Sequence, residues 1–403
     1  MSKEFFEQVR QDFPALIASE YTYLDSAATM HKPRCVIDAL STFYGKEYAT
    51  VNRAVYQPAM KATDLYAAAR STLARFINAP PSEVVFTRGA TDSLNIIADS
   101  LARSVLNHSS RILVSEMEHH SNLIPWQIAA KLSGASLESI PITDDGVLRL
   151  DALKELLSSG RVAVVALTHA SNVLGTINPI ADIAAMVHEA GALLVVDGAQ
   201  AAPHLPVDVQ ALQCDAYVFS AHKLGGPTGV GLLWAKQNLL EQLPPTRGGG
   251  DMIDVVSFSS ATWADAPQKF EPGTPPIAEA IGFGAAIEYL SSLPSVVEHE
   301  RSLLSYLRQG LATIPGLKLI GTVQPRVPLQ CFHLPGIHPL DIATFLDLSK
   351  VAVRSGHMCC QPLMNRLSLS ALTRVSLAFY NTFQDIDRCV EGLKAAVQKL
   401  LPI

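Results

Sequence analysis

The sequence has few charged residues, few cysteines and no long hydrophobic run. Charged side chains make up 17% of the 403 residues, and the net charge of −6 comes without any run of Lys or Arg. Such a balance argues against a nucleic acid or an anionic membrane surface as the main partner. The longest apolar runs, such as residues 162–167, fall far short of the ~20 residues that a membrane span requires. Six cysteines in a chain of this length indicate no dense disulfide framework. We therefore expect a soluble, cytoplasmic protein that binds neither nucleic acid nor membrane.

Between residues 79 and 236, short apolar runs alternate with amphipathic stretches. Because these runs are apolar on both faces, the alternation predicts an α/β fold with a mostly parallel, seven-stranded sheet covered by helices. The predicted strands are 83–86, 111–114, 136–140, 162–167, 193–196, 216–219 and 231–234, and helical patterns include 91–106, 123–132 and 179–189.

The chain is long enough, and at 48% apolar rich enough in hydrophobic residues, for two or three domains with large cores. After Pro267 a Pro/Gly-rich segment leads into a helical pattern over 277–290 and an α+β stretch that ends in a helix at 383–401. Residues 1–21 have the pattern of an amphipathic helix and not of a signal peptide. We predict a large domain over 20–270 and a smaller α+β domain built from 1–19 and 271–403.

Polar clusters follow five of the predicted strands. In parallel sheets ligands bind beyond the carboxyl ends of the strands, so five clusters at five strand ends predict a single site. The clusters begin at Arg88, Glu118, Thr168, Asp197 and Ser220.

A lysine and an aspartate suggest the chemistry of that site. Lys223 lies between an apolar strand and a glycine-rich turn, where desolvation would free its amine for Schiff-base chemistry, although a lysine there can also cap a helix or pair with a carboxylate. Asp197 ends a buried run and needs a cationic partner. A lysine Schiff base with an aspartate on a pyridinium nitrogen is typical of pyridoxal 5'-phosphate (PLP) sites.

The remaining polar groups fit the same cofactor, although each taken singly has a structural explanation as well. Amides between a strand and a helix can cradle a phosphate, imidazoles can stack on the pyridine ring, and amides can donate to the phenolic oxygen. The candidates are Ala90, Thr91, Ser220 and His222 for the phosphate, His119 or His120 for the ring, and Asn172 and Gln200 for the phenolic oxygen.

A last cluster, Arg354-Ser-Gly-His-Met-Cys-Cys-Gln-Pro, contains two adjacent cysteines. It is consistent with a plain loop, with a weak zinc site at His357, Cys359 and Cys360, or with a nucleophilic thiol near basic residues. Farther along, Arg374 is suited to binding a substrate carboxylate through two parallel hydrogen bonds.

These motifs, together with Tyr23-Leu-Asp-Ser-Ala-Ala and Glu271-Pro-Gly-Thr-Pro, resemble the group II (SufS/CsdA-type) cysteine desulfurases. These enzymes belong to the class V branch of the PLP-dependent transferases of fold type I. The resemblance extends over nearly the whole chain. It implies PLP as the cofactor and a homodimer, with no catalytic metal.

The resemblance also implies roles for individual residues. Catalysis would fall to Lys223, which binds PLP, to His119, which lies on the ring face and moves protons, and to Cys359, which is selected over Cys360 as the nucleophile. The other implied contacts are Asp197 on the pyridinium; Gln200 and Asn172 near the phenolic oxygen; Ala90, Thr91, Ser220 and His222 at the phosphate; Thr274 from the partner subunit; and Arg374 with Arg354 and Asn172 at the substrate.

The implied reaction converts L-cysteine to L-alanine and leaves the sulfur on Cys359 as a persulfide. An acceptor protein of the SufE/CsdE type would then carry the sulfur to iron–sulfur cluster assembly. Selenocysteine and cysteine sulfinate are further candidate substrates. The alternatives are another class V PLP enzyme, such as an aminotransferase or an epimerase, or a non-catalytic paralogue that binds sulfur carriers.

Overall fold

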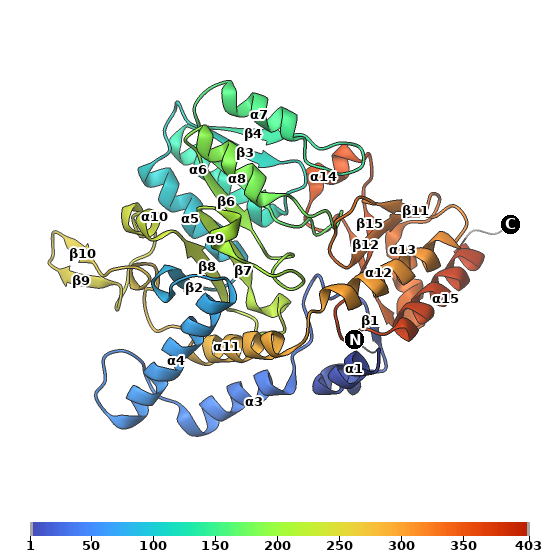
Figure 1. Cartoon of the computed structure of the whole chain (residues 1–403), viewed down its shortest axis with the longest axis horizontal. Helices are drawn as coiled ribbons and strands as arrows, with labels where there is room; N and C mark the ends of the chain where they lie inside the picture. The colour runs from blue at the N-terminus through green and yellow to red at the C-terminus, as the bar shows by residue number, and fades with distance from the viewer. Residues whose placement is uncertain (1–2, 401–403) are drawn as a thin grey trace.

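A seven-stranded sheet forms the centre of the structure, a computed structural model that describes residues 3–400 (Figure 1). The strands lie in the order β2-β8-β7-β6-β5-β3-β4, and only β8 runs antiparallel to its neighbours. Each predicted strand is present to within one residue at either end, and the predicted mostly parallel sheet is confirmed. The strands are β2 Val84–Thr87, β3 Arg111–Ser115, β4 Ser136–Ile140, β5 Val162–Thr168, β6 Leu193–Asp197, β7 Ala216–Ser220 and β8 Gly231–Ala235.

Both faces of this sheet are buried under helices, because successive strand residues alternate between two apolar cores. On β6, Leu194 and Val196 pack in one core while Val195 packs in the other. The first core also takes residues from α4 Gln57–Phe76, α7 Leu150–Ser158, α8 Ile180–Glu189 and α11 Ile277–Ser292, and the second from α5 Ala90–Ser104, α6 Ile124–Ser133 and α10 Gln237–Gln242.

The C-terminal part of the chain forms a second sheet with its own core, drawn in orange and red in Figure 1. Four antiparallel strands lie in the order β11-β12-β15-β14 and pack against three helices. The elements are β11 Lys318–Ile320, β12 Leu329–His333, β14 Arg354–Gly356, β15 Leu372–Ser376, α12 Val297–Ala312, α13 Pro339–Leu348 and α15 Phe383–Leu400. Position 401, where the predicted last helix ends, lies outside the described residues.

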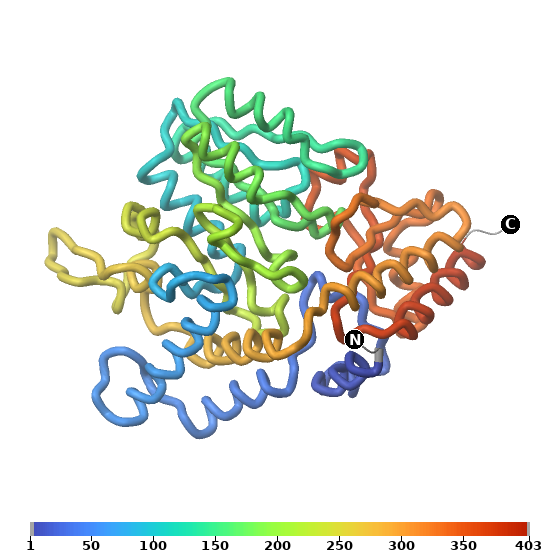
Figure 2. The backbone as a smooth tube through the Cα atoms, in the orientation of Figure 1, coloured from blue at the N-terminus to red at the C-terminus, as the bar shows by residue number. Residues whose placement is uncertain are grey.

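The N-terminal segment packs on this second domain, as the blue and red ends of the tube in Figure 2 show. The prediction of one continuous helix over 1–21 was wrong. The segment instead forms α1 Lys3–Val9, a 3₁₀ turn and α2 Pro14–Ile17, because Pro14 has no N–H to donate and disfavours a helical Phe13. The apolar residues on either side of the break still face one core, since Phe6 and Phe13 are both buried in the cluster that contains Tyr380.

Helix α11 packs with the large domain, although the predicted boundary at residues 270 and 271 assigns it to the small one. It lies against α3 Arg34–Thr42 and α4 in Figure 1, and its Phe283 and Ile287 are part of the large core. The limits 20–270 and 271–403 remain a prediction, and this packing favours a boundary after α11. The remaining short elements are β1 Thr22–Tyr23, β13 Val351–Ala352, β9 Ile253–Val256, β10 Ala261–Trp263, α9 Val209–Leu212 and α14 Gln361–Arg366.

Among residues 3–400, no single helix has the length and apolar composition to cross a membrane. Taken together as one segment, α11 and α12 meet this test, but by length and composition alone. The two helices are bent by 83° at the break between them.

Candidate active site

A cavity of about 470 Å³ opens where the carboxyl ends of the parallel strands face the second domain. All five polar clusters that the sequence places at strand ends reach this region, and the loop after β14 closes it from the other side. The structure brings these predicted residues together in its lining: Ala90, Thr91, His119, Asn172, Asp197, Gln200, Ser220, His222, Lys223, Arg354, Cys359 and Arg374.

Lys223 and Asp197 face the cavity from neighbouring strand ends. Lys223 ends the 3₁₀ turn after β7, and burial lowers the pKa of its amine to about 8, with the charge of Asp197 opposing that shift. Within residues 3–400 this amine has no hydrogen-bond or ion-pair partner. Burial raises the pKa of Asp197, whose Oδ1 accepts a 2.9 Å hydrogen bond from the Ala199 amide. The pair therefore combines a readily neutralised amine with a carboxylate that still needs a cationic partner.

Gly89, Ala90 and Thr91, at the start of α5, present uncharged hydrogen-bond donors to the cavity, and we call this group the Gly89 cradle. Gly89 has a φ of +149°, and a Cβ there would lie 3.2 Å from Ser220 Oγ, so only glycine fits without strain. The Ala90 amide donates to Ser220 Oγ at 2.8 Å, and Thr91 Oγ1 lies 2.7 Å from Ser121 Oγ. Amides at the first turn of a helix carry partial positive charge, so this end of the cavity is suited to a phosphate.

Two histidines of the cavity are held neutral. Burial, with the charge of Lys223 second, lowers the pKa of His119 and of His222 to about 4. His119 Nδ1 accepts a 3.0 Å hydrogen bond from the Ser121 amide, so its ring proton is on Nε2. Each histidine therefore acts as a polar group without charge at neutral pH.

Glu118, next to His119, is a buried carboxyl that begins one of the predicted polar clusters, but sequence reasoning assigned it no role of its own. Burial raises the pKa of Glu118 to about 8, although the hydrogen bonds that the carboxylate accepts lower it. It accepts from Asn122 Nδ2 at 2.6 Å and from the Thr168 amide at 3.0 Å, and the Ser115 hydroxyl donates to it as well. These bonds fix the backbone from which His119 enters the cavity.

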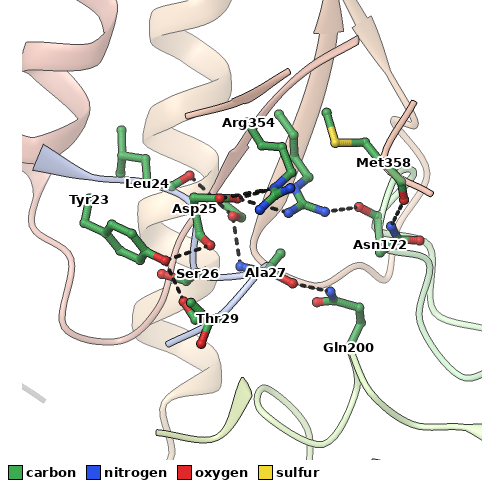
Figure 3. Close-up of polar contacts among 12 residues, drawn as sticks. Tyr23, Leu24, Asp25, Ser26, Ala27, Thr29, Asn172, Gln200, Arg354 and Met358 are labelled. Atoms are coloured by element: carbon green, nitrogen blue, oxygen red, sulfur yellow. Dashed lines mark hydrogen bonds and ion pairs between the residues drawn. The ribbon is translucent and has the colours of Figure 1, made fainter. Parts of the chain in front are cut away.

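The side-chain amides of Asn172 and Gln200, predicted to contact a phenolic oxygen, contact backbone carbonyls in this structure (Figure 3). Asn172 Nδ2 donates to the Met358 carbonyl at 2.8 Å, and Gln200 Nε2 donates to the Ala27 carbonyl at 2.7 Å. Both side chains line the cavity, and each amide nitrogen donates one of its two N–H groups to a backbone carbonyl of the protein. Contacts of these amides with a cofactor therefore remain a prediction.

Cys359 lies at the tip of a strained loop after β14. Met358 and Cys359 have φ values of 52° and 55°, in the left-handed region that costs non-glycine residues energy. The loop is held by its backbone: the His120 amide donates to the Cys359 carbonyl at 2.7 Å, and the Cys359 amide donates to His357 Nδ1 at 3.1 Å. The Cys359 side chain is exposed and borders the cavity.

Cys360, in contrast, is buried. Its thiol donates to Asn172 Oδ1 at 3.1 Å, and burial raises its pKa far above the ordinary range. A thiol so placed is a poor nucleophile, because the thiolate is the reactive form. It is also a poor zinc ligand, and among residues 3–400 no group of three or more His, Cys, Asp and Glu side chains is arranged to hold a metal ion.

Two arginines approach the cavity from β14 and β15, and both contact Asp25. Arg374 is buried, donates to the Asn172 carbonyl at 3.0 Å, and lies 3.1 Å from Asp25 Oδ1. Arg354 is half-exposed, and its Nε lies 3.2 Å from Asp25 Oδ2 (Figure 3). Sequence reasoning quoted the segment that contains Asp25 but gave this residue no role. The available signal was an acid directly after the apolar pair Tyr23-Leu24.

Thr274 is the predicted site residue that does not reach this cavity. It is exposed, in the loop before α11. The contact of Thr274 with the site of a partner subunit remains a prediction.

The chemistry of these groups fits PLP. An amine without a partner at Lys223 can bind an aldehyde, the buried Asp197 carboxylate can face a protonated ring nitrogen, and the Gly89 cradle with Ser220 can take a phosphate.

Comparison with known proteins agrees with this assignment. Residues 22–389 match the family model for class-V aminotransferases. A probable cysteine desulfurase from Streptomyces coelicolor is 46% identical over 402 residues, covering 96% of each chain. The crystal structure of the cysteine desulfurase CsdA from Escherichia coli superposes with a TM-score of 0.92 at 39% identity, over 98% of this chain and 99% of that one. An apo cysteine desulfurase from Thermococcus onnurineus gives a TM-score of 0.93 at 33% identity, over 98% of each chain.

Proposed function

This chain belongs to the class-V aminotransferase family, and we propose that it is a PLP-dependent cysteine desulfurase that converts L-cysteine to L-alanine and takes up the sulfur on Cys359 as a persulfide. The observation that carries the proposal is the exposed thiol of Cys359 at the edge of the cavity that contains Lys223. An aminotransferase or an epimerase needs the lysine but has no use for such a thiol.

Lys223, Asp197 and the Gly89 cradle would hold the cofactor. When bound, PLP withdraws electron density from the substrate Cα and so weakens the bonds to it. Asp197 would keep the ring nitrogen protonated by lying against it as an anion. Lys223, whose pKa of about 8 leaves a fraction of the amine neutral near pH 7, would take the proton from Cα.

Sulfur transfer would be carried out by Cys359 and assisted by His119. The Cys359 thiolate attacks the substrate sulfur, so that an Sγ–S bond forms and the substrate Cβ–S bond breaks. The electron pair of the broken bond stays with the carbon skeleton, which becomes alanine once protons return to it. His119, neutral and with its proton on Nε2, is suited to passing protons within the cavity.

Incubation of the PLP-loaded protein with L-cysteine tests this function. Without reductant we expect alanine and protein-bound sulfur in equal amounts during the first turnover, and with reductant continuous release of sulfide. An aminotransferase would instead require a keto acid, and an epimerase would form the D-amino acid. Alanine formed without any sulfur on the protein would contradict the proposal.

We further propose that the enzyme acts as a homodimer in which Thr274 completes the partner's site. A second, open pocket of about 500 Å³ borders Thr91, Ser220 and His222 on the outside of the cradle, where a residue from another subunit has access. The loop that carries Thr274 is held firmly, because Glu271 pairs with the buried Arg70 at 2.6 Å and accepts from the Phe86 amide at 2.6 Å. A preformed loop loses little entropy on meeting a partner.

The persulfide would pass from Cys359 to an acceptor protein of the SufE/CsdE type for iron–sulfur cluster assembly. The exposure of this thiol supports such a transfer, since a second protein can approach it. Action on selenocysteine or cysteine sulfinate and a cytoplasmic location remain predictions.

Attachment of PLP to the cofactor-free protein is expected to accelerate as the pH rises to about 8 and then to level off. Only the neutral amine attacks an aldehyde, and burial lowers the pKa of Lys223 from 10.5 to about 8. The amine is therefore protonated below this pH and neutral above it. The visible absorbance of the bound cofactor, followed after mixing at a series of pH values, measures the rate. A rate that keeps rising up to about pH 10 would indicate an ordinary lysine instead.

A further inference from the structure

The loop that carries Cys359 has a backbone conformation that its own residues do not favour. Met358 and Cys359 have φ values of 52° and 55°, in the left-handed region, and neither residue is a glycine. Such a conformation persists only where neighbouring groups hold it in place. The contacts that hold this loop therefore determine where the Cys359 thiol lies.

His120 contacts the loop at two points, one on each side of Cys360. Its backbone amide donates to the Cys359 carbonyl at 2.7 Å, and its Nε2 accepts a 3.2 Å hydrogen bond from the Gln361 amide. Gln361 is the first residue of α14, so its amide has no acceptor within that helix. His120 therefore binds the backbone at both ends of the segment 359–361.

The His120 side chain makes this contact in its neutral form. Because Nε2 accepts a hydrogen bond, the ring proton is on Nδ1. Burial, with the charge of His357 second, lowers the pKa of His120, so the ring is mainly neutral at neutral pH. The ring of His357 lies 5.6 Å away, and its Nδ1 accepts a 3.1 Å hydrogen bond from the Cys359 amide. Two neutral imidazoles thus accept amides of the same loop.

The adjacent residues His119 and His120 serve different parts of the site. The sequence offered either one for the ring of the cofactor, but only His119 lines the cavity. The two rings lie 6.3 Å apart, and the His120 ring contacts the loop instead. Because both residues follow the hydrogen-bonded Glu118, the loop and His119 share one support. His120 therefore relates the position of the thiol to that of His119.

We propose that His120 is a positioning residue for sulfur transfer, whose neutral imidazole holds the segment 359–361 so that the Cys359 thiol borders the cavity. This inference rests on the proposed desulfurase function. His120 does not line the cavity, so it acts through the loop and not on the reacting atoms. Asn172 also holds the loop, through the Met358 carbonyl at 2.8 Å (Figure 3), so loss of the His120 side chain should loosen the segment without unfolding it.

The test compares His120→Ala and His120→Gln with the wild type as PLP-loaded enzymes. Alanine removes the Nε2 acceptor and keeps the backbone amide, whereas Oε1 of a glutamine can accept from the Gln361 amide in place of Nε2. After mixing with L-cysteine, the first change in the visible absorbance of the cofactor reports the reaction at PLP. The mass of the peptide that contains residue 359, in samples quenched over time, reports sulfur transfer.

We expect His120→Ala to keep the absorbance change near the wild-type rate and to slow persulfide formation about tenfold or more, because the thiol is no longer held in place. His120→Gln should restore most of the rate of persulfide formation. His338→Ala is the matched control, since His338 Nδ1 accepts the Leu340 amide at 3.2 Å at the start of α13, outside the cavity. This variant should transfer sulfur as the wild type does.

Protection of Cys360 gives a second readout that needs no turnover. The Cys360 thiol is buried, so iodoacetamide reaches it only when the loop opens. In a Cys359→Ser background, His120→Ala should raise the rate of Cys360 alkylation about threefold to tenfold, as the loss of one hydrogen bond allows. His120→Gln in the same background should leave that rate near its starting value.

The two readouts separate the role of His120 from the function of the enzyme. If His120→Ala forms the persulfide and protects Cys360 as the wild type does, the inference fails. It also fails if the absorbance change and sulfur transfer slow together and glutamine restores neither, because the residue is then only structural. If the wild type takes up no sulfur from L-cysteine, the desulfurase function fails, and the alkylation rates of Cys360 still decide whether His120 holds the loop.

Discussion

Substitution of Lys223 by alanine is expected to lower alanine formation from L-cysteine by about 10³-fold or more, since it removes both the covalent anchor of the cofactor and the base for the Cα proton. The amine lines the cavity, has no partner within residues 3–400, and has a pKa lowered to about 8. Among residues 3–400, no other lysine lines the cavity and could replace it. The absorbance of the purified variant reports the loss of covalently bound PLP. Amino-acid analysis after incubation with L-cysteine reports the loss of alanine formation.

Lys236→Ala is a suitable control for this experiment. Lys236 pairs with Asp215 at 2.7 Å outside the cavity and is also partly buried. Its loss should leave turnover intact, because the pair lies outside the cavity. Retention of covalently bound PLP, or of substantial turnover, in a folded Lys223→Ala protein would refute the assignment of the lysine.

Substitution of Cys359 by serine is expected to abolish sulfur transfer from L-cysteine, again by about 10³-fold or more, while PLP remains attached. A hydroxyl at this position is neither ionised near neutral pH nor able to form a persulfide. The measurements are sulfide release with reductant and the mass of the peptide that contains residue 359 without it. We expect the extra sulfur atom on that peptide in the wild type and its absence in the variant.

Cys360→Ser is the matched control, one position away on the same loop. The serine hydroxyl can still donate to Asn172 Oδ1, and the buried thiol of Cys360 is not available as a nucleophile. Turnover should therefore persist, and iodoacetamide should modify Cys359 before Cys360. If Cys360→Ser is inactive and Cys359→Ser is not, the roles of the two cysteines are reversed.

The large domain was predictable because its signals are local. A strand buried on both faces appears as a short apolar run, and a polar cluster marks the point where it ends, as after Leu193-Leu-Val-Val at Asp197. The N-terminal helix was predicted too long for an equally local reason, since Pro14 interrupts the helical backbone within an amphipathic pattern. The resemblance to a family selected Cys359 over Cys360, and the structure supplies a physical reason in the burial of Cys360.

Contacts between distant segments had no such signal. Asn172 and Gln200 were predicted as donors to a ligand, yet their amides bind the carbonyls of Met358 and Ala27, more than 170 positions away in each case. Asp25 meets Arg354 and Arg374 only because β15 passes beside the segment after β1.

The linear order of residues by itself determined the types of the strands and helices of the sheet domain, the lysine and aspartate that a PLP site requires, and the family. Only the tertiary structure decided which side chains are free to act. Burial and hydrogen bonding depend on neighbours far apart in the chain, and these two effects distinguish the exposed thiol of Cys359 from the bound thiol of Cys360.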